Sequence, residues 1–208
     1  FQMNQRAGRR WSGTKAFLRP IRQRPNLTVR VGAHVERIVV KTGDAGRCAT
    51  GVVLVGDDEV LEARREVILA AGSIGSPQIL QLSGIGPSAV LQEHDIDVVH
   101  HLPGVGENLQ DHLQIRTIFT VQNTVTLNTR VNSIFGKAAM GLEYLLFKTG
   151  PLTMPPSQLG AFAKSDASRA SANMEWHVQP LSLDKFGDPL HTFDAITPSV
   201  CNLQPTSR

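Results

Sequence analysis

The most informative segment of the chain reads AAGSIGSPQILQLSGIG and spans residues 70–86. The segment begins where an apolar run at residues 66–70 ends. Its first four residues have almost no side chain: Ala70, Ala71, Gly72 and Ser73. Small residues at a strand end let another backbone, a helix or a flat ligand approach the main chain closely. Pro77 suits the first turn of a helix over residues 77–82, with Ser76 as its N-cap. The segment therefore predicts a strand, a tight turn and a helix.

The turn between this strand and this helix has two interpretations. A helix N-terminus that follows a strand is a favourable place for a phosphate group, because its first N–H groups lack partners within the helix. The same residues also suit a purely structural turn. Their spacing alone leaves both interpretations open.

On the N-terminal side of this segment, residues 26–71 have the short period of β-strands. We expect strands at residues 27–31, 35–40 and 49–55, with a turn at residues 42–46. Residues 66–70 lose the polar alternation, as a strand buried on both faces would. The pattern predicts a β-meander of three or four strands.

On the C-terminal side, a Gly-rich loop at residues 102–112 leads to a different pattern. Residues 115–121 alternate like a strand, and residues 132–148 predict a long helix whose apolar face holds Ile134, Phe135, Ala138, Leu142, Leu145 and Leu146. Further strands are expected at residues 158–163, 174–178 and 193–203. The predicted fold class is mixed α/β (α+β), with a β-meander in the first lobe and an antiparallel sheet with a helix in the second.

The composition is that of a globular protein. The chain has 208 residues, of which 41% are hydrophobic and 19% charged, so the disordered, collagen-like and disulfide-framework classes are excluded. No apolar run approaches the roughly 20 residues that span a bilayer. Cys48 and Cys201 lie far apart without a CxxC motif, so we expect no metal site and a reducing, cytoplasmic location. Because the chain begins at Phe1 rather than Met, we interpret it as an interior piece of a longer protein.

The first 30 residues are strongly basic, with eight Lys and Arg and no acid. Such an arm can be a solvated face, a contact for an anionic cofactor or an acidic segment, or a nucleic-acid contact. We expect no nucleic acid, because no DNA-binding motif or base-stacking aromatic pattern accompanies the basic residues. The competing class of function is a non-enzymatic binding or interaction module with a basic N-terminal arm.

Four motifs resemble one known family in content and order. They are the segment at residues 70–86, then GTKAFL at 13–18 with RPNLTV at 24–29, then GVGENLQDH at 104–112 and LQPTSR at 203–208. Together they resemble the glucose–methanol–choline (GMC) family of flavin-dependent alcohol oxidoreductases, in its choline dehydrogenase-like branch. The resemblance extends over the whole chain.

The resemblance implies an enzyme that binds FAD and oxidises the CH–OH group of a small alcohol, with hydride passing to flavin N5. It implies that residues 1–112 belong to a FAD-binding domain and residues 113–208 to a substrate-binding domain. The GxGxxG turn of the family is absent, and the catalytic residues are expected C-terminal to Arg208. We therefore expect residues 1–208 alone to be inactive, and the remaining segments of the same enzyme to be their partners.

The resemblance also implies roles for individual residues. Val35 matches a position whose backbone meets the adenine of FAD, and Ala70, Ala71 and Gly72, followed by Ser73, match the strand end beside the adenosine and pyrophosphate. Asn108 and His112, like Phe1-Gln2, match segments near the flavin or its covering loop, with hydrogen-bonded loop packing as the alternative. Among the other histidines, His177 is a candidate for the substrate cavity, with a packing or surface role as the alternative. His100 and His101 are neighbours in a strand-like run and point to opposite faces, so they are unsuited to one metal ion.

Overall fold

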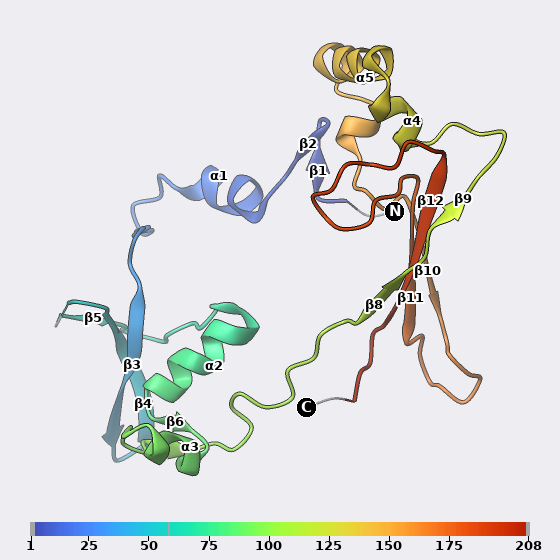
Figure 1. The fold of residues 1–208 in the computed structure, drawn as a ribbon. Helices are drawn as coiled ribbons and strands as arrows, with labels where there is room; N and C mark the ends of the chain where they lie inside the picture. The colour runs from blue at the N-terminus through green and yellow to red at the C-terminus, as the bar shows by residue number, and fades with distance from the viewer. Residues whose placement is uncertain (1–2, 58, 207–208) are drawn as a thin grey trace. The chain divides into compact units, whose positions relative to one another are not determined.

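The computed structural model describes residues 3–57 and 59–206. The chain forms two compact units (Figure 1). One unit combines the described part of Phe1–Leu27 with Asp111–Pro205, and the other is Thr28–Gln110 together with Thr206. The division at residue 112 into a FAD-binding and a substrate-binding domain stays a prediction, because these units do not show what either part binds.

Three antiparallel strands of the second unit form the predicted meander. They are β3 (Val35–Gly43), β4 (Gly46–Leu54) and β5 (Val60–Glu62), in the order β3-β4-β5. Ile38, Val53 and Leu54 are buried on this sheet. At Gly51 any Cβ atom would meet the backbone of Leu61 in β5, so only glycine lets these strands pair closely.

Helix α2 (Gly72–Leu82) packs against β3. It begins five residues before the predicted start at Pro77, and Pro77 lies inside the helix. Gly72 has φ of +83°, which redirects the chain into the helix and which glycine adopts without strain. Ser76 is therefore not the N-cap. Its Oγ instead accepts a hydrogen bond from the Ala71 N–H, at 3.1 Å.

After α2 the chain makes a small parallel pair, β6 (Ile85–Gly86) with β7 (His100–His101), around helix α3 (Ser88–Glu93). Leu91 is the buried residue of α3. Gly84 has φ of +79°, and a Cβ atom at this position would meet the Asp97 carbonyl oxygen. Both facts require glycine at the turn between α2 and β6.

Two predicted strands are wrong. Residues 27–31 form no strand, and neither do residues 66–70. The second run is apolar, yet Ile68 is 79% exposed, because no strand of the described residues pairs with it. An apolar pattern alone does not make a strand, since backbone N–H and C=O groups need a partner strand.

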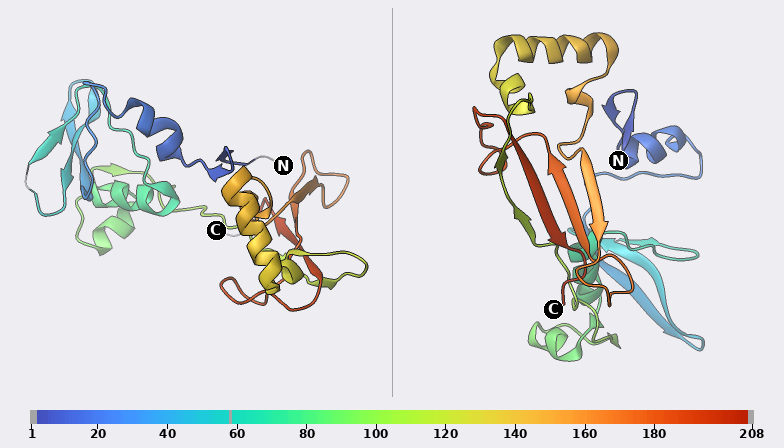
Figure 2. Two further views of the ribbon diagram at one scale, coloured as in Figure 1. Left: turned by 90° about the horizontal axis from the view of Figure 1, so that it is seen from above. Right: turned by 90° about the vertical axis from the view of Figure 1, so that its right-hand side faces the viewer.

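The first unit is built on an antiparallel sheet, as predicted. Its order is β10 (Leu159–Ala163), β11 (Met174–Gln179), β12 (Ala195–Asn202) and β8 (Gln114–Arg116), and β9 (Phe119–Thr120) also pairs with β12. The right-hand view of Figure 2 shows β10, β11 and β12 side by side. Alternate residues of β12 are buried, so this strand lies at the centre of the unit.

Two helices precede this sheet in the chain. The expected long helix is α5 (Ile134–Phe147), and α4 (Leu127–Asn132) before it was not predicted. Ser133 is the N-cap of α5, because its Oγ accepts from the Gly136 N–H at 3.2 Å. The predicted packing face of α5 is exposed, with Phe135 at 87% and Leu145 at 69%, and Met140 is the buried side chain of this helix. None of the helices in the described residues is both long enough and apolar enough to cross a membrane.

The N-terminal residues pack against the end of α5. Strands β1 (Gln5–Arg6) and β2 (Arg9–Arg10) form a hairpin, which is followed by a π-helical turn (Thr14–Leu18) and the short α1 (Arg19–Ile21). At the hairpin tip, Gly8 leaves no room for a Cβ atom against the Lys148 carbonyl. Gln5 Nε2 donates to the Thr153 carbonyl at 3.2 Å. These contacts attach the N-terminal hairpin to the second half of the chain.

Candidate functional site

A cavity of about 570 Å³ lies between the start of β3 and the N-terminal half of α2. It brings together Val35 and Ala71, which are distant in sequence and were both predicted to touch a cofactor. The wall combines small and apolar residues with three polar ones. The full lining is Ala33, His34, Val35, Glu36, Val55, Ala71, Gly75, Gln78, Ile79 and Leu82. The meander and α2 therefore create this cavity together.

The N-terminus of α2 is open for an anionic group. The N-cap residue Ala71 has no side-chain oxygen to accept from the first N–H groups of the helix, and the first turn contains no acid. At Gly72 there is open space where a Cβ atom would lie, and both Gly72 and Ser73 are exposed. The first N–H groups of a helix carry a partial positive charge and lack partners within the helix, so this end suits a phosphate or another anion.

A second cavity of about 550 Å³ also borders the N-terminal half of α2. Ser73 and Ile74 of α2 line it, together with Gly106 and Asn108 of the loop after β7. Asn108 has φ of +60°, a left-handed conformation that asparagine tolerates better than most residues. Ser73 and Asn108 thus line the same cavity, and Ala70 is exposed next to Ala71.

His112 belongs to the other unit, so the structure does not relate it to Asn108. Its side chain is exposed, and its backbone N–H donates to Asp111 Oδ1 at 2.8 Å. The predicted proximity of His112 to the flavin stays a prediction. The same holds for Phe1-Gln2, which lie outside the described residues.

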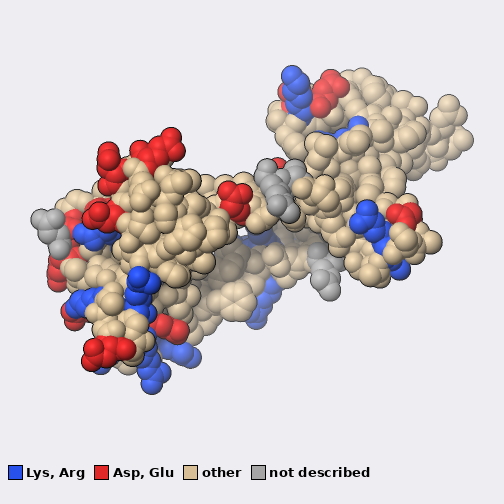
Figure 3. All heavy atoms as spheres, turned by 90° about the horizontal axis from the view of Figure 1, so that it is seen from below, with Lys and Arg blue, Asp and Glu red and all other residues tan. Residues whose placement is uncertain are grey.

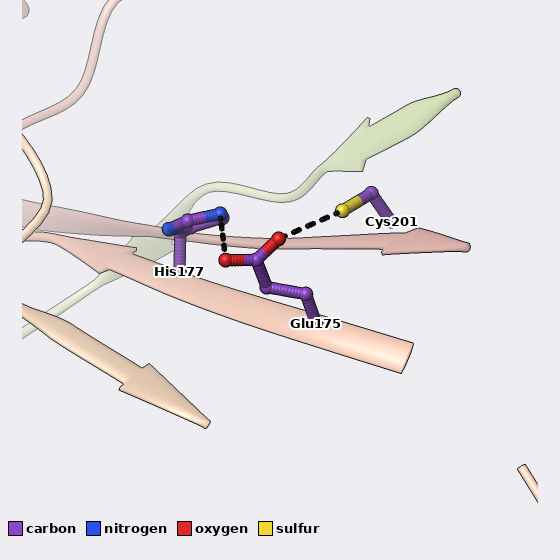
Figure 4. Close-up of side chains that lie close together, drawn as sticks. All are labelled: Glu175, His177 and Cys201. Atoms are coloured by element: carbon purple, nitrogen blue, oxygen red, sulfur yellow. Dashed lines mark hydrogen bonds and ion pairs between the residues drawn. The ribbon is translucent and has the colours of Figure 1, made fainter. Parts of the chain in front are cut away.

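His177 lies in a cluster on β11 and β12 (Figure 4). Its Nε2 is 3.1 Å from Glu175 Oε1, and Cys201 Sγ donates to Glu175 Oε2 at 3.7 Å. His177 Nδ1 is buried and has no hydrogen-bond partner in the described part of the chain. Burial, and secondarily the neighbouring Glu175 carboxylate, raises the pKa of the Cys201 thiol, which therefore stays protonated near neutral pH. Whether His177 faces a substrate cavity stays a prediction.

The sequence analysis missed Glu175 and Cys201 as neighbours of His177. Glu175 and His177 are two residues apart in a strand, so their shared face could have been predicted from the period of two. Cys201 lies opposite Glu175 through the register of β11 with β12. No sequence signal reveals that register.

The basic arm is partly engaged in local contacts. The Arg6 guanidinium lies 5.2 Å from the ring centre of Trp11, and Lys15 Nζ donates to the Arg10 carbonyl at 3.1 Å.

On the face drawn in Figure 3, basic and acidic side chains are interspersed over the unit formed by Thr28–Gln110.

The fold is found in solved structures. It superposes on the crystal structure of a formate oxidase with a TM-score of 0.77 and 23% sequence identity, over 97% of this chain and 39% of that one. This structural similarity establishes the architecture, which is a mixed α/β arrangement with several small antiparallel sheets. The mixed α/β fold class predicted from the sequence is confirmed.

The sequence comparisons then define the family. The family model described as GMC oxidoreductase matches residues 1–114. The chain is 42% identical over 178 residues to the oxygen-dependent choline dehydrogenase of Brucella ovis, covering 85% of this chain and 31% of that protein. It is 35% identical over 213 residues to the alcohol dehydrogenase [acceptor] of Pseudomonas putida, covering 100% of this chain and 38% of that protein.

The chain belongs to the GMC oxidoreductase family. The resemblance to its choline dehydrogenase-like branch is confirmed by the Brucella relative. The chain spans about a third of the length of the curated relatives it matches. Membership of an enzyme family does not favour the alternative of a non-enzymatic module with a basic arm.

Proposed function

We propose that these residues are part of an FAD-dependent oxidoreductase that oxidises the CH–OH group of a small alcohol. Family membership supports the reaction class, and the names of the two relatives support choline or another alcohol as the substrate class. The observation that carries the proposal is the cavity that unites Val35 with Ala71 beside the open N-terminus of α2.

The residues at this cavity fit the adenosine and diphosphate part of FAD. Val35, Val55 and Ile79 give this wall apolar side chains that suit a flat aromatic base, and the polar His34, Glu36 and Gln78 lie beside them. Next to them, Gly72 and Gly75 keep side chains away from the backbone N–H groups of α2, which suits a diphosphate. A flat apolar group and an anion can therefore be held side by side by one strand end and one helix end.

The proposed roles of these residues are binding and orientation. Val35 would hold the base through its backbone, and Ala71, Gly72 and Ser73 would receive the phosphates. When bound, FAD supplies the acceptor for the hydride that leaves the alcohol carbon. The group that takes the hydroxyl proton is proposed to lie outside residues 1–208, so these residues alone would neither turn over an alcohol nor keep FAD during gel filtration.

The test uses the full natural chain and the substitution Ala71→Leu, which fills the cavity. We expect the affinity for FAD to fall at least tenfold, measured by titrating the apoprotein with FAD. The matched control is Ala89→Leu at an exposed position of α3, which should leave FAD affinity unchanged. Equal FAD affinity in a folded Ala71→Leu variant and the control would contradict the proposed site.

A further inference from the structure

The three side chains of the Glu175–His177–Cys201 cluster include one carboxylate, one imidazole and one thiol. One ligand atom from each lies within 4.8 Å of the other two. These are the three ligand types that Zn²⁺ uses in proteins, and a mixed set of this kind leaves a fourth tetrahedral position open. We propose that Glu175, His177 and Cys201 form a binding site for a Zn²⁺ ion.

The distances are close to those of a bound state. With Zn–S of about 2.3 Å and Zn–N or Zn–O of about 2.0–2.2 Å, tetrahedral ligands lie about 3.3–3.7 Å from one another. Glu175 Oε1 is 3.1 Å from His177 Nε2, and Glu175 Oε2 is 3.7 Å from Cys201 Sγ. Because one ligand atom from each residue lies within 4.8 Å of the other two, the widest separation has to shorten by about 1–1.5 Å, which side-chain rotation can provide.

The backbone places the three side chains on one face of the sheet. Glu175 and His177 alternate in the same direction on β11, and Cys201 is the direct partner of Glu175 on β12. On the other side of β11, the residue opposite His177 is Gly160 of β10. Gly160 has no side chain that could compete with an ion for the imidazole.

The chemical state of the cluster also favours a cation. His177 Nε2 is the ring nitrogen that faces Glu175 and would bind the ion, whereas Nδ1 is buried without a partner among the described residues and points away from the cluster (Figure 4). With Cys201 as thiolate and Glu175 as carboxylate, the two negative charges balance those of Zn²⁺. The thiol proton passes to solvent as the Zn–S bond forms, so atoms and charge are conserved.

The site is reachable but protected. The side chains of His177 and Glu175 are 23% and 22% exposed, so an ion can enter from solvent. Cys201 is buried at the floor of the cluster. A buried thiol beside a half-buried carboxylate and imidazole differs from the scattered surface carboxylates that bind cations weakly.

The experiment titrates Zn²⁺ alone into the full natural chain after chelator treatment, by calorimetry and without any alcohol. We expect one equivalent to bind, and Cys201→Ser and His177→Gln each to weaken that binding at least tenfold. The matched controls are Cys48→Ser and His94→Gln, which change an exposed cysteine and an exposed histidine of the other unit and should leave Zn²⁺ affinity unchanged.

X-ray absorption of the Zn²⁺-loaded protein separates loss of a ligand from loss of the fold. We expect one sulfur neighbour at about 2.3 Å in the unsubstituted protein, and only nitrogen and oxygen neighbours in Cys201→Ser. The proposal is overturned if Zn²⁺ does not bind saturably, or if the cluster variants bind it as tightly as the controls do. Neither result bears on the FAD site, because that site is tested by FAD titration of Ala71→Leu.

Discussion

The hydroxyl of Ser83 accepts a hydrogen bond from the backbone N–H of Ile38, at 2.8 Å. The same hydroxyl donates to the Ile79 carbonyl at 2.6 Å. One buried side chain thus joins the last turn of α2 to the middle of β3, the two elements that border the proposed FAD cavity. The shape of that cavity depends on this connection.

Ser83→Ala should destabilise the protein by about 1–3 kcal/mol, because it leaves the buried Ile38 N–H without a partner. Urea unfolding measures this change in the free energy of unfolding. Ser168→Ala is the control, since the Ser168 hydroxyl donates to Asp166 at an exposed site and its loss should cost within about 0.5 kcal/mol. A similar decrease in the free energy of unfolding in both variants would argue against the role given to Ser83.

Gly84→Ala should lower the free energy of unfolding by about 1–3 kcal/mol, because of the positive φ and the nearby Asp97 carbonyl. Gly43→Ala is the matched glycine control at the end of β3, where an added methyl group would meet no atom within 4 Å and φ is not positive. Thermal unfolding compares the two variants. A melting temperature that falls as far for Gly43→Ala as for Gly84→Ala would be inconsistent with this expectation.

Asp194→Asn should lower stability at neutral pH and not at strongly acidic pH. The Asp194 carboxylate accepts from the Thr126 N–H at 2.8 Å, the Thr126 hydroxyl at 2.7 Å and the Thr129 hydroxyl at 2.8 Å. The Thr126 N–H first, and then the two hydroxyls, hold the pKa of Asp194 below its usual value of 3.8. A lowered folded-state pKa adds stability above the unfolded pKa, and this stability is lost as pH falls through the folded pKa.

The measurement for Asp194 is the melting temperature of both proteins as a function of pH. The difference between them should be constant above about pH 5 and should shrink below about pH 4. Asp44→Asn, in the exposed β3–β4 turn, is the control. A difference for Asp194→Asn that does not change down to low pH would show that its charge is not involved.

Met140→Ala should lower the free energy of unfolding by about 2–5 kcal/mol, because Met140 is the buried side chain of α5 in the described residues. Leu145→Ala, on the exposed face of the same helix, should cost less than about 1 kcal/mol. Denaturant unfolding of the full natural chain compares the two. A large cost for Leu145→Ala would show that another part of the protein covers that face.

The sequence predicts most of the second unit because its signals are local. The turn at residues 42–46 and the β-branched runs beside it fix β3 and β4, and the glycines after α2 fix the turn to β6. The start of α2 could not be placed, because the positive φ of Gly72 outweighs the usual preference of Pro77 for the first turn. Residues 66–70 show the opposite case, where an apolar pattern has no strand to pair with.

Part of the candidate site could also be predicted, because its signals are local in the sequence. Ala71 and Val35 each have a local signal or a family match, and the structure supplies their common cavity. The neighbourhood of His177 depends on how two strands 26 residues apart in the chain align, as the Glu175–Cys201 pair shows. Strand register of this kind is set by the packing of the whole sheet and not by nearby residues.

The contacts of the N-terminal hairpin have a consequence for how the protein folds. Because Gly8 packs against Lys148, and Thr28–Gln110 forms a unit of its own, one unit is inserted in the sequence of the other. During synthesis the inserted unit can fold as soon as it leaves the ribosome, whereas the hairpin must wait for α5. Closing the intervening loop costs about 4 kcal/mol of chain entropy if the loop is unfolded, and less if the inserted unit has already brought its ends together.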